Sequence, residues 1–145
     1  TQTKKLFIGT NIGDVTIGVV TSTTYTVTVG SKDGGGNAFY IDSVQRPILT
    51  LNEGSTYIFN LSDNTVDSHP FYLSTTSDGS HSSGSIYSTG VVYKINGSSV
   101  SQSAYNSGYS SATTRALEIT VASGAPTLYY YCAVHSGMGN QINTS

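Results

Sequence analysis

Short segments in which apolar or β-branched residues alternate with polar ones recur along the chain, separated by clusters of glycine, asparagine and serine. A period of two predicts half-buried β-strands, and the separating residues predict turns. No window sustains the 3.6-residue period of an amphipathic helix. We therefore predict an all-β sandwich or barrel. The predicted strands are Lys4–Ile8, Asp14–Val20, Thr23–Val29, Ala38–Asp42, Ile48–Leu51, Thr56–Leu61, Pro70–Ser74, Gly90–Ile95, Ala116–Val121, Thr127–Cys132 and Gln141–Asn143.

Two regions stand apart from this pattern. The strands from Tyr25 to Ile142 suffice for a two-sheet domain, so we divide the chain into an N-terminal arm or added strand, residues 1–22, and a domain, residues 23–145. For the arm we favour an extra edge strand of the same sandwich over a strand that pairs with a neighbouring subunit. Residues 75–114 are rich in serine and glycine and contain one convincing strand, so we expect surface loops there.

The composition excludes several classes of protein. Only 10% of the residues are charged, with six basic and eight acidic side chains, and no cluster of Lys and Arg is present to bind nucleic acid or an anionic membrane. No apolar run approaches the roughly 20 residues of a membrane-spanning helix, which predicts a soluble protein. The single cysteine cannot form an intramolecular disulfide, so its thiol needs another explanation.

A candidate metal site follows the predicted strand that ends at Cys132. The segment CAVHSGM runs from Cys132 to Met138 with His135 between them, and a tight loop can bring all three side chains to one point. Thiolate and thioether are soft ligands that favour copper, above all Cu(I). His69 is the best candidate for a remote fourth ligand, because it follows a turn-rich stretch and opens a new strand. His81 lies between two serines in a polar loop, and we expect it to be a solvated side chain.

Three other interpretations of Cys132 are possible. Most isolated cysteines are small, buried and inert, but His135 and Met138 at this spacing favour ligation over that interpretation. Cys132 and His135 could be nucleophile and base, yet no orienting acid or oxyanion loop accompanies them, so we predict that the protein is not an enzyme. Zinc is disfavoured because a thioether is a poor zinc ligand and structural zinc sites usually contain more cysteines.

The spacing Cys132-x2-His135-x2-Met138 resembles the ligand loop of amicyanin and of the short-loop relatives of plastocyanin and pseudoazurin, all members of the cupredoxin family. The resemblance extends in outline from Tyr25 to Ile142. It implies a Greek-key β-sandwich with one type 1 copper ion, bound by the imidazole nitrogens of His69 and His135, the Cys132 thiolate and, weakly, Met138.

One residue departs from the pattern of this family. Many electron-transfer cupredoxins have an asparagine after the first histidine ligand, whereas here Pro70 follows His69 and has no backbone N–H to donate. The bracing of the ligand loop must therefore differ from that of these relatives.

Three stretches also resemble cupredoxin-like modules in structural proteins of marine cyanophages and related bacteria. On this basis we predict a copper-binding structural subunit of a virion or other extracellular assembly, which associates with itself. The alternative is a soluble one-electron carrier, periplasmic in location, with a redox partner protein and an electron path through His135. The stretches are NAFYIDSVQRPILTLNEGSTYIFNLSD, SHPFYLST and LYYYCAVHSGMGN.

Overall fold

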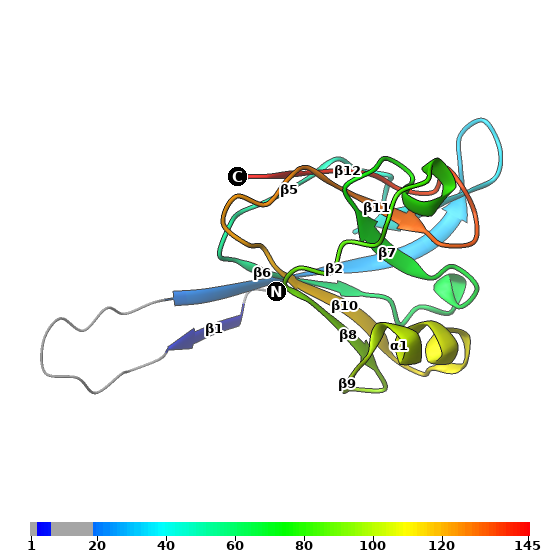
Figure 1. The fold of residues 1–145 in the computed structure, drawn as a ribbon. Helices are drawn as coiled ribbons and strands as arrows, with labels where there is room; N and C mark the ends of the chain where they lie inside the picture. The colour runs from blue at the N-terminus through cyan, green and yellow to red at the C-terminus, as the bar shows by residue number, and fades with distance from the viewer. Residues whose placement is uncertain (1–2, 7–18) are drawn as a thin grey trace, which may run out of the picture.

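The protein is a two-sheet β-sandwich, described by a computed structural model over residues 3–6 and 19–145 (Figure 1). The larger sheet is mixed, because β2 and β6 are parallel and its other neighbours are antiparallel. Its strands lie in the order β4 (Val44–Gln45), β3 (Asn37–Ile41), β2 (Val19–Ser31), β6 (Thr56–Asn60), β10 (Arg115–Thr120), β8 (Val91–Ile95) and β9 (Ser98–Val100), and β1 (Thr3–Leu6) also pairs with β2. The smaller sheet has the order β5 (Leu49–Leu51), β12 (Asn140–Thr144), β11 (Leu128–Cys132) and β7 (Phe71–Ser74).

Alternating burial along the strands builds the core between the sheets. In β6 and β10 every second side chain is buried, as the period of two predicts. Aromatic rings join the two layers: the Phe71 ring of the smaller sheet lies 5.0 Å from that of Phe59 and 5.1 Å from that of Phe39 in the larger sheet. This packing fixes the start of β7, which is separated from His69 only by Pro70.

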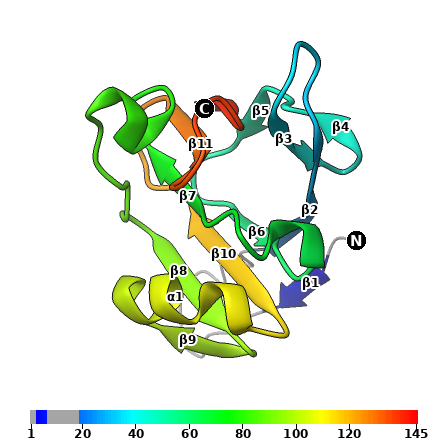
Figure 2. The same cartoon turned by 90° about the vertical axis from the view of Figure 1, so that its right-hand side faces the viewer.

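The strand β7 is buried on both faces, since all four of its residues are buried. Its second face is covered by tyrosines, among them Tyr105 of the helix α1 (Gln102–Gly108). The Tyr105 hydroxyl donates a hydrogen bond to the Phe71 carbonyl at 3.0 Å, and its ring lies 5.4 Å from that of Tyr72. Figure 2 shows α1 beside β8 and β9.

The sandwich prediction is confirmed, whereas Greek-key connectivity stays a prediction. The region 75–114 is more regular than expected: besides the predicted strand it contains β9, α1 and two single-turn helices, η2 (Gly79–Ser82) and η3 (Tyr109–Ser111). A third such turn, η1 (Asn64–Val66), precedes His69. The expectation of no helix was therefore wrong for α1, which is too short to show a period of its own.

The N-terminal prediction is tested only in small part. Residues 7–18, which include parts of the first two predicted strands, lie outside the described residues. β1 pairs antiparallel with the first residues of β2, and β2 continues without a break from Val19 to Ser31 across the predicted boundary at residue 22. The division into arm and domain stays a prediction.

Candidate metal centre

His69 is placed by the short connection between η1 and β7. Asp63 caps η1 by accepting the N–H of Thr65 at 2.9 Å, and the His69 N–H donates to the Val66 carbonyl at 2.9 Å. Pro70 then ends the turn because it fixes an extended approach to β7. The imidazole is thereby held at the end of the smaller sheet and is only 6% exposed.

Strand pairing brings Cys132 beside this histidine. Cys132 is the last residue of β11 and pairs with Phe71 of β7. One step further along, the Ala133 N–H donates to the Pro70 carbonyl at 2.9 Å. His69 and Cys132 are 63 positions apart in the sequence, yet this register makes them neighbours.

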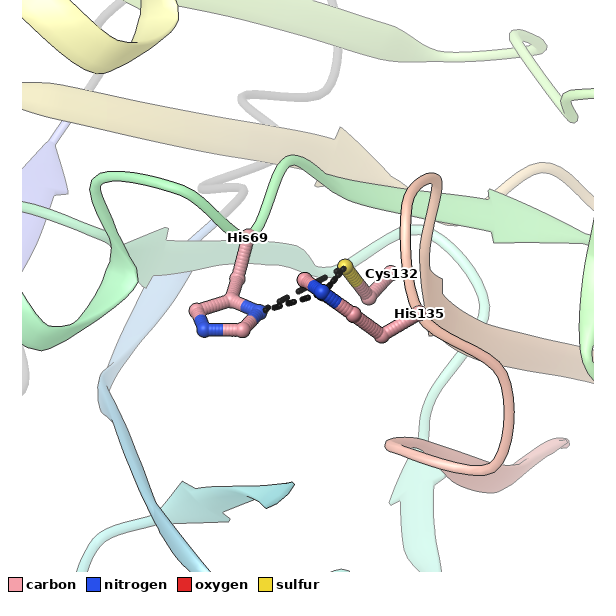
Figure 3. Close-up of side chains that lie close together, drawn as sticks. All are labelled: His69, Cys132 and His135. Carbon is pink, nitrogen blue, oxygen red and sulfur yellow. Dashed lines mark hydrogen bonds between the residues drawn. The ribbon is translucent and has the colours of Figure 1, made fainter. Parts of the chain in front are cut away.

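Three ligand atoms converge at this point (Figure 3). The Nδ1 atoms of His69 and His135 are 3.1 Å apart, and the Cys132 Sγ lies 3.8 Å from the first and 3.9 Å from the second. The candidate ligand atoms of these residues all lie within 4.8 Å of one another. The structure therefore brings together three of the four residues predicted as metal ligands.

The spacing of these atoms fits one metal ion. With bonds of about 2.0 Å to nitrogen and about 2.3 Å to sulfur, ligands about 120° apart would leave about 3.5 Å between the nitrogens and about 3.7 Å between nitrogen and sulfur. The observed nitrogen–sulfur distances of 3.8 and 3.9 Å match these values closely. The shorter nitrogen–nitrogen distance of 3.1 Å corresponds to a narrower angle between the two imidazoles.

Burial sets the protonation of the metal-free site. It lowers the pKa of His69 below its usual value, and the neighbouring His135 lowers it further. Burial also raises the pKa of the Cys132 thiol, although backbone N–H groups of His135 and Val134 act in the opposite direction. His69 is thus ready to coordinate in its neutral form, whereas metal binding must displace the thiol proton of Cys132.

Met138 lies at the far end of the ligand loop, which we define as residues 132–138. Its side chain is fully buried, and its carbonyl accepts the N–H of Phe39 at 2.9 Å. It lines a surface hollow together with His135. Met138 is therefore shielded from water and lies close to His135 in the loop.

The ligand loop is braced by backbone hydrogen bonds and by one lysine. The Pro70 carbonyl takes the N–H of Ala133, and the N–H of Val134 points at the Cys132 sulfur, 3.4 Å away. The Lys32 ammonium donates to the Gly137 carbonyl at 3.2 Å. These contacts brace the loop at both ends, and that this bracing differs from that of the cupredoxins stays a prediction.

Sequence reasoning missed two residues that contact the ligand loop. His81 is exposed, as expected for a solvated side chain, but its Nε2 lies 2.8 Å from the Cys132 carbonyl oxygen. Asp78 accepts the N–H of Gly137 at 2.9 Å. Both lie in a polar serine- and glycine-rich stretch that offers no pattern by which to single them out.

None of the helices within residues 3–6 and 19–145 is both long and apolar enough to cross a membrane. The donor atoms of His69, Cys132 and His135 are the strongest indication of function in the part of the chain that the structure describes. No protein-family model matches the chain, and comparison with curated proteins finds no match.

Proposed function

We propose that the protein binds one copper ion through His69, Cys132 and His135, with Met138 as a weak axial ligand. The observation that carries the proposal is the convergence of two imidazole nitrogens and one buried sulfur at distances that suit a single ion. Two imidazoles, a thiolate and a distant thioether form the donor set of blue-copper sites. A bound copper ion of this type supplies a one-electron couple.

The same features argue against zinc and against catalysis. A structural zinc site would normally have four strong ligands and more cysteines. A catalytic cysteine needs a depressed pKa, whereas burial raises the pKa of Cys132. These observations support a metal-binding module and disfavour a thiol enzyme.

A visible absorption spectrum tests the copper proposal. Adding Cu(II) to the purified protein is expected to produce an intense thiolate-to-copper band near about 600 nm. Cys132→Ser removes the thiolate while nearly preserving side-chain size, so this control is expected to show no such band. A wild-type protein that takes up no copper, or a band that survives in the control, would overturn the proposal.

Electron transfer is a second candidate role, and the exposure of His135 favours it. His69 and Cys132 are buried, while His135 reaches the surface, so electrons have a short path to a partner that docks there. A reversible copper couple would support this role, and a site that cannot cycle would contradict it. The role as a virion or extracellular assembly subunit stays a prediction.

Replacing Met138 with leucine tests the axial ligand. Leucine fills nearly the same buried volume, so the fold and the thiolate band are expected to persist. Loss of the sulfur donor destabilises Cu(II) more than Cu(I), and the reduction potential is therefore expected to rise. Voltammetry of the two proteins measures this, and an unchanged potential would show that Met138 does not ligate the metal.

A further inference from the structure

We infer that Asp78 and His81 form a clamp that holds the ligand loop in its ligating shape before a metal arrives. The inference rests on the proposed copper site, because it assigns the clamp a role at that site. Asp78 directly precedes η2 and His81 lies within it. The clamp would make both of them positioning residues that act on the metal through the ligand loop.

The two residues contact opposite ends of the loop. His81 meets the Cys132 carbonyl at 2.8 Å, at the loop's first residue, and Asp78 meets the Gly137 N–H at 2.9 Å, one residue before Met138. A carbonyl oxygen can only accept, so the Nε2 of His81 carries the proton and donates it. A single turn of chain therefore fixes the backbone on both sides of His135.

The turn is itself anchored on the strand that ends in Cys132. Gly79 lies so close to the Tyr131 ring that a Cβ there would overlap it, and the His81 ring meets the same tyrosine edge-on, with centroids 6.5 Å apart. The Gly84 N–H closes the turn by donating to the Gly79 carbonyl at 2.9 Å. Because η2 packs on Tyr131, the residue before Cys132, the clamp holds the ligand loop in a fixed position relative to β11.

Such contacts affect metal binding through geometry. Some residues orient the metal ligands through hydrogen bonds without touching the metal themselves. Removing such a residue typically weakens metal binding 10- to 100-fold. His81→Ala and Asp78→Ala are therefore each expected to weaken copper binding about tenfold, as measured by competition with a chelator. His81→Gln keeps a side-chain donor and Asp78→Asn keeps an acceptor oxygen, so both are expected to restore most of the affinity.

Asp42→Ala is the matched control. Asp42 and Asp78 both have a left-handed backbone, with φ of 48° and 61°, and the Oδ1 of each accepts one backbone N–H. Asp42 pairs with Thr26, away from the ligand loop. The control thus reproduces the local loss of stability, and it is expected to leave copper affinity unchanged.

A second measurement needs no metal. In the metal-free protein Cys132 is fully buried, so its alkylation by iodoacetamide at fixed pH reports how often the ligand loop opens. The Asp78 charge also raises the pKa of this thiol, and Asp78→Asn, which removes the same charge, controls for that effect. Labelling is expected to be severalfold faster in His81→Ala and Asp78→Ala than in the wild type, but not in the glutamine, asparagine or Asp42→Ala variants.

The two measurements separate the clamp from the copper proposal. A wild-type protein that binds no copper while the alanine variants label faster would overturn the copper site and support the clamp as a loop support. Copper binding in the wild type with equal affinities and equal labelling rates in the alanine variants would overturn the clamp and leave the copper site intact.

Discussion

Replacing Arg115 with leucine is expected to lower the free energy of unfolding by about 3 to 5 kcal/mol. The arginine is 2% exposed; its Nε donates to the Leu61 carbonyl at 2.8 Å and its Nη1 to the Tyr109 carbonyl at 2.5 Å. Its remaining nitrogen pairs with the carboxylate of Asp67. Leucine can fill part of the space but leaves two buried carbonyls without a donor. Denaturant unfolding of the metal-free protein measures the loss.

The control is a second cation on a neighbouring strand. Lys94 pairs with Glu118 at 2.8 Å, but their side chains are 34% and 21% exposed. Exposed pairs contribute little, so Lys94→Leu is expected to cost no more than about 1 kcal/mol. A loss for Arg115→Leu as small as that of the control would contradict the assigned role of Arg115.

The same arginine links stability to the candidate metal site. It ties β10 to the segment from Leu61 to Asp67, and His69 follows two residues later. Under conditions in which Arg115→Leu is still folded, we expect the segment that leads to His69 to be less rigidly anchored and the position of the His69 imidazole to be less well fixed. This role could not be predicted from the sequence, because Arg115 stands there as a single charged residue directly before the predicted strand Ala116–Val121.

The strands were predictable because their alternation is local. A period of two in segments such as Thr56–Leu61 follows from one buried and one exposed face, and the structure confirms it in β6. Helix α1 had no such signal, since seven residues make only two turns. It is stabilised from outside, through the buried Tyr105 and through Ser101, whose side chain accepts the Ala104 N–H at 3.1 Å. The pair Tyr105 and Tyr109, four residues apart, was the available clue.

The candidate ligands were predictable for a different reason. Cys132, His135 and Met138 lie within one short loop, so their chemistry is visible in the sequence, and His69 could be added as a remote partner. What the sequence could not reveal is the support from outside the loop. Asp78 and His81 act through a backbone N–H and a carbonyl, and any polar residue brought to the same place by tertiary packing could supply such contacts.

Gly139→Ala is expected to cost about 3 kcal/mol of stability and to abolish copper binding. Gly139 lies where the chain leaves the ligand loop and enters β12, and a Cβ there would overlap the Tyr130 carbonyl oxygen and lie 2.6 Å from its carbon. The Tyr130 carbonyl is part of the backbone of β11, and in the sheet Tyr130 pairs with Asn140 of β12. They cannot move aside alone, so β11 and β12 must separate and displace His135 and Met138.

The control for this variant lies two residues away, at Gly137. Its φ of 72° strains any side chain, but a Cβ there would meet only the tip of Lys32, at 3.0 Å. A flexible ammonium can withdraw, so Gly137→Ala is expected to cost only about 1 to 2 kcal/mol of backbone strain. Denaturant unfolding and the copper absorption band compare the two variants. Equal stability in both would mean that β12 can shift away from β11 without cost, and the close approach at Gly139 would then play no part in shaping the ligand loop.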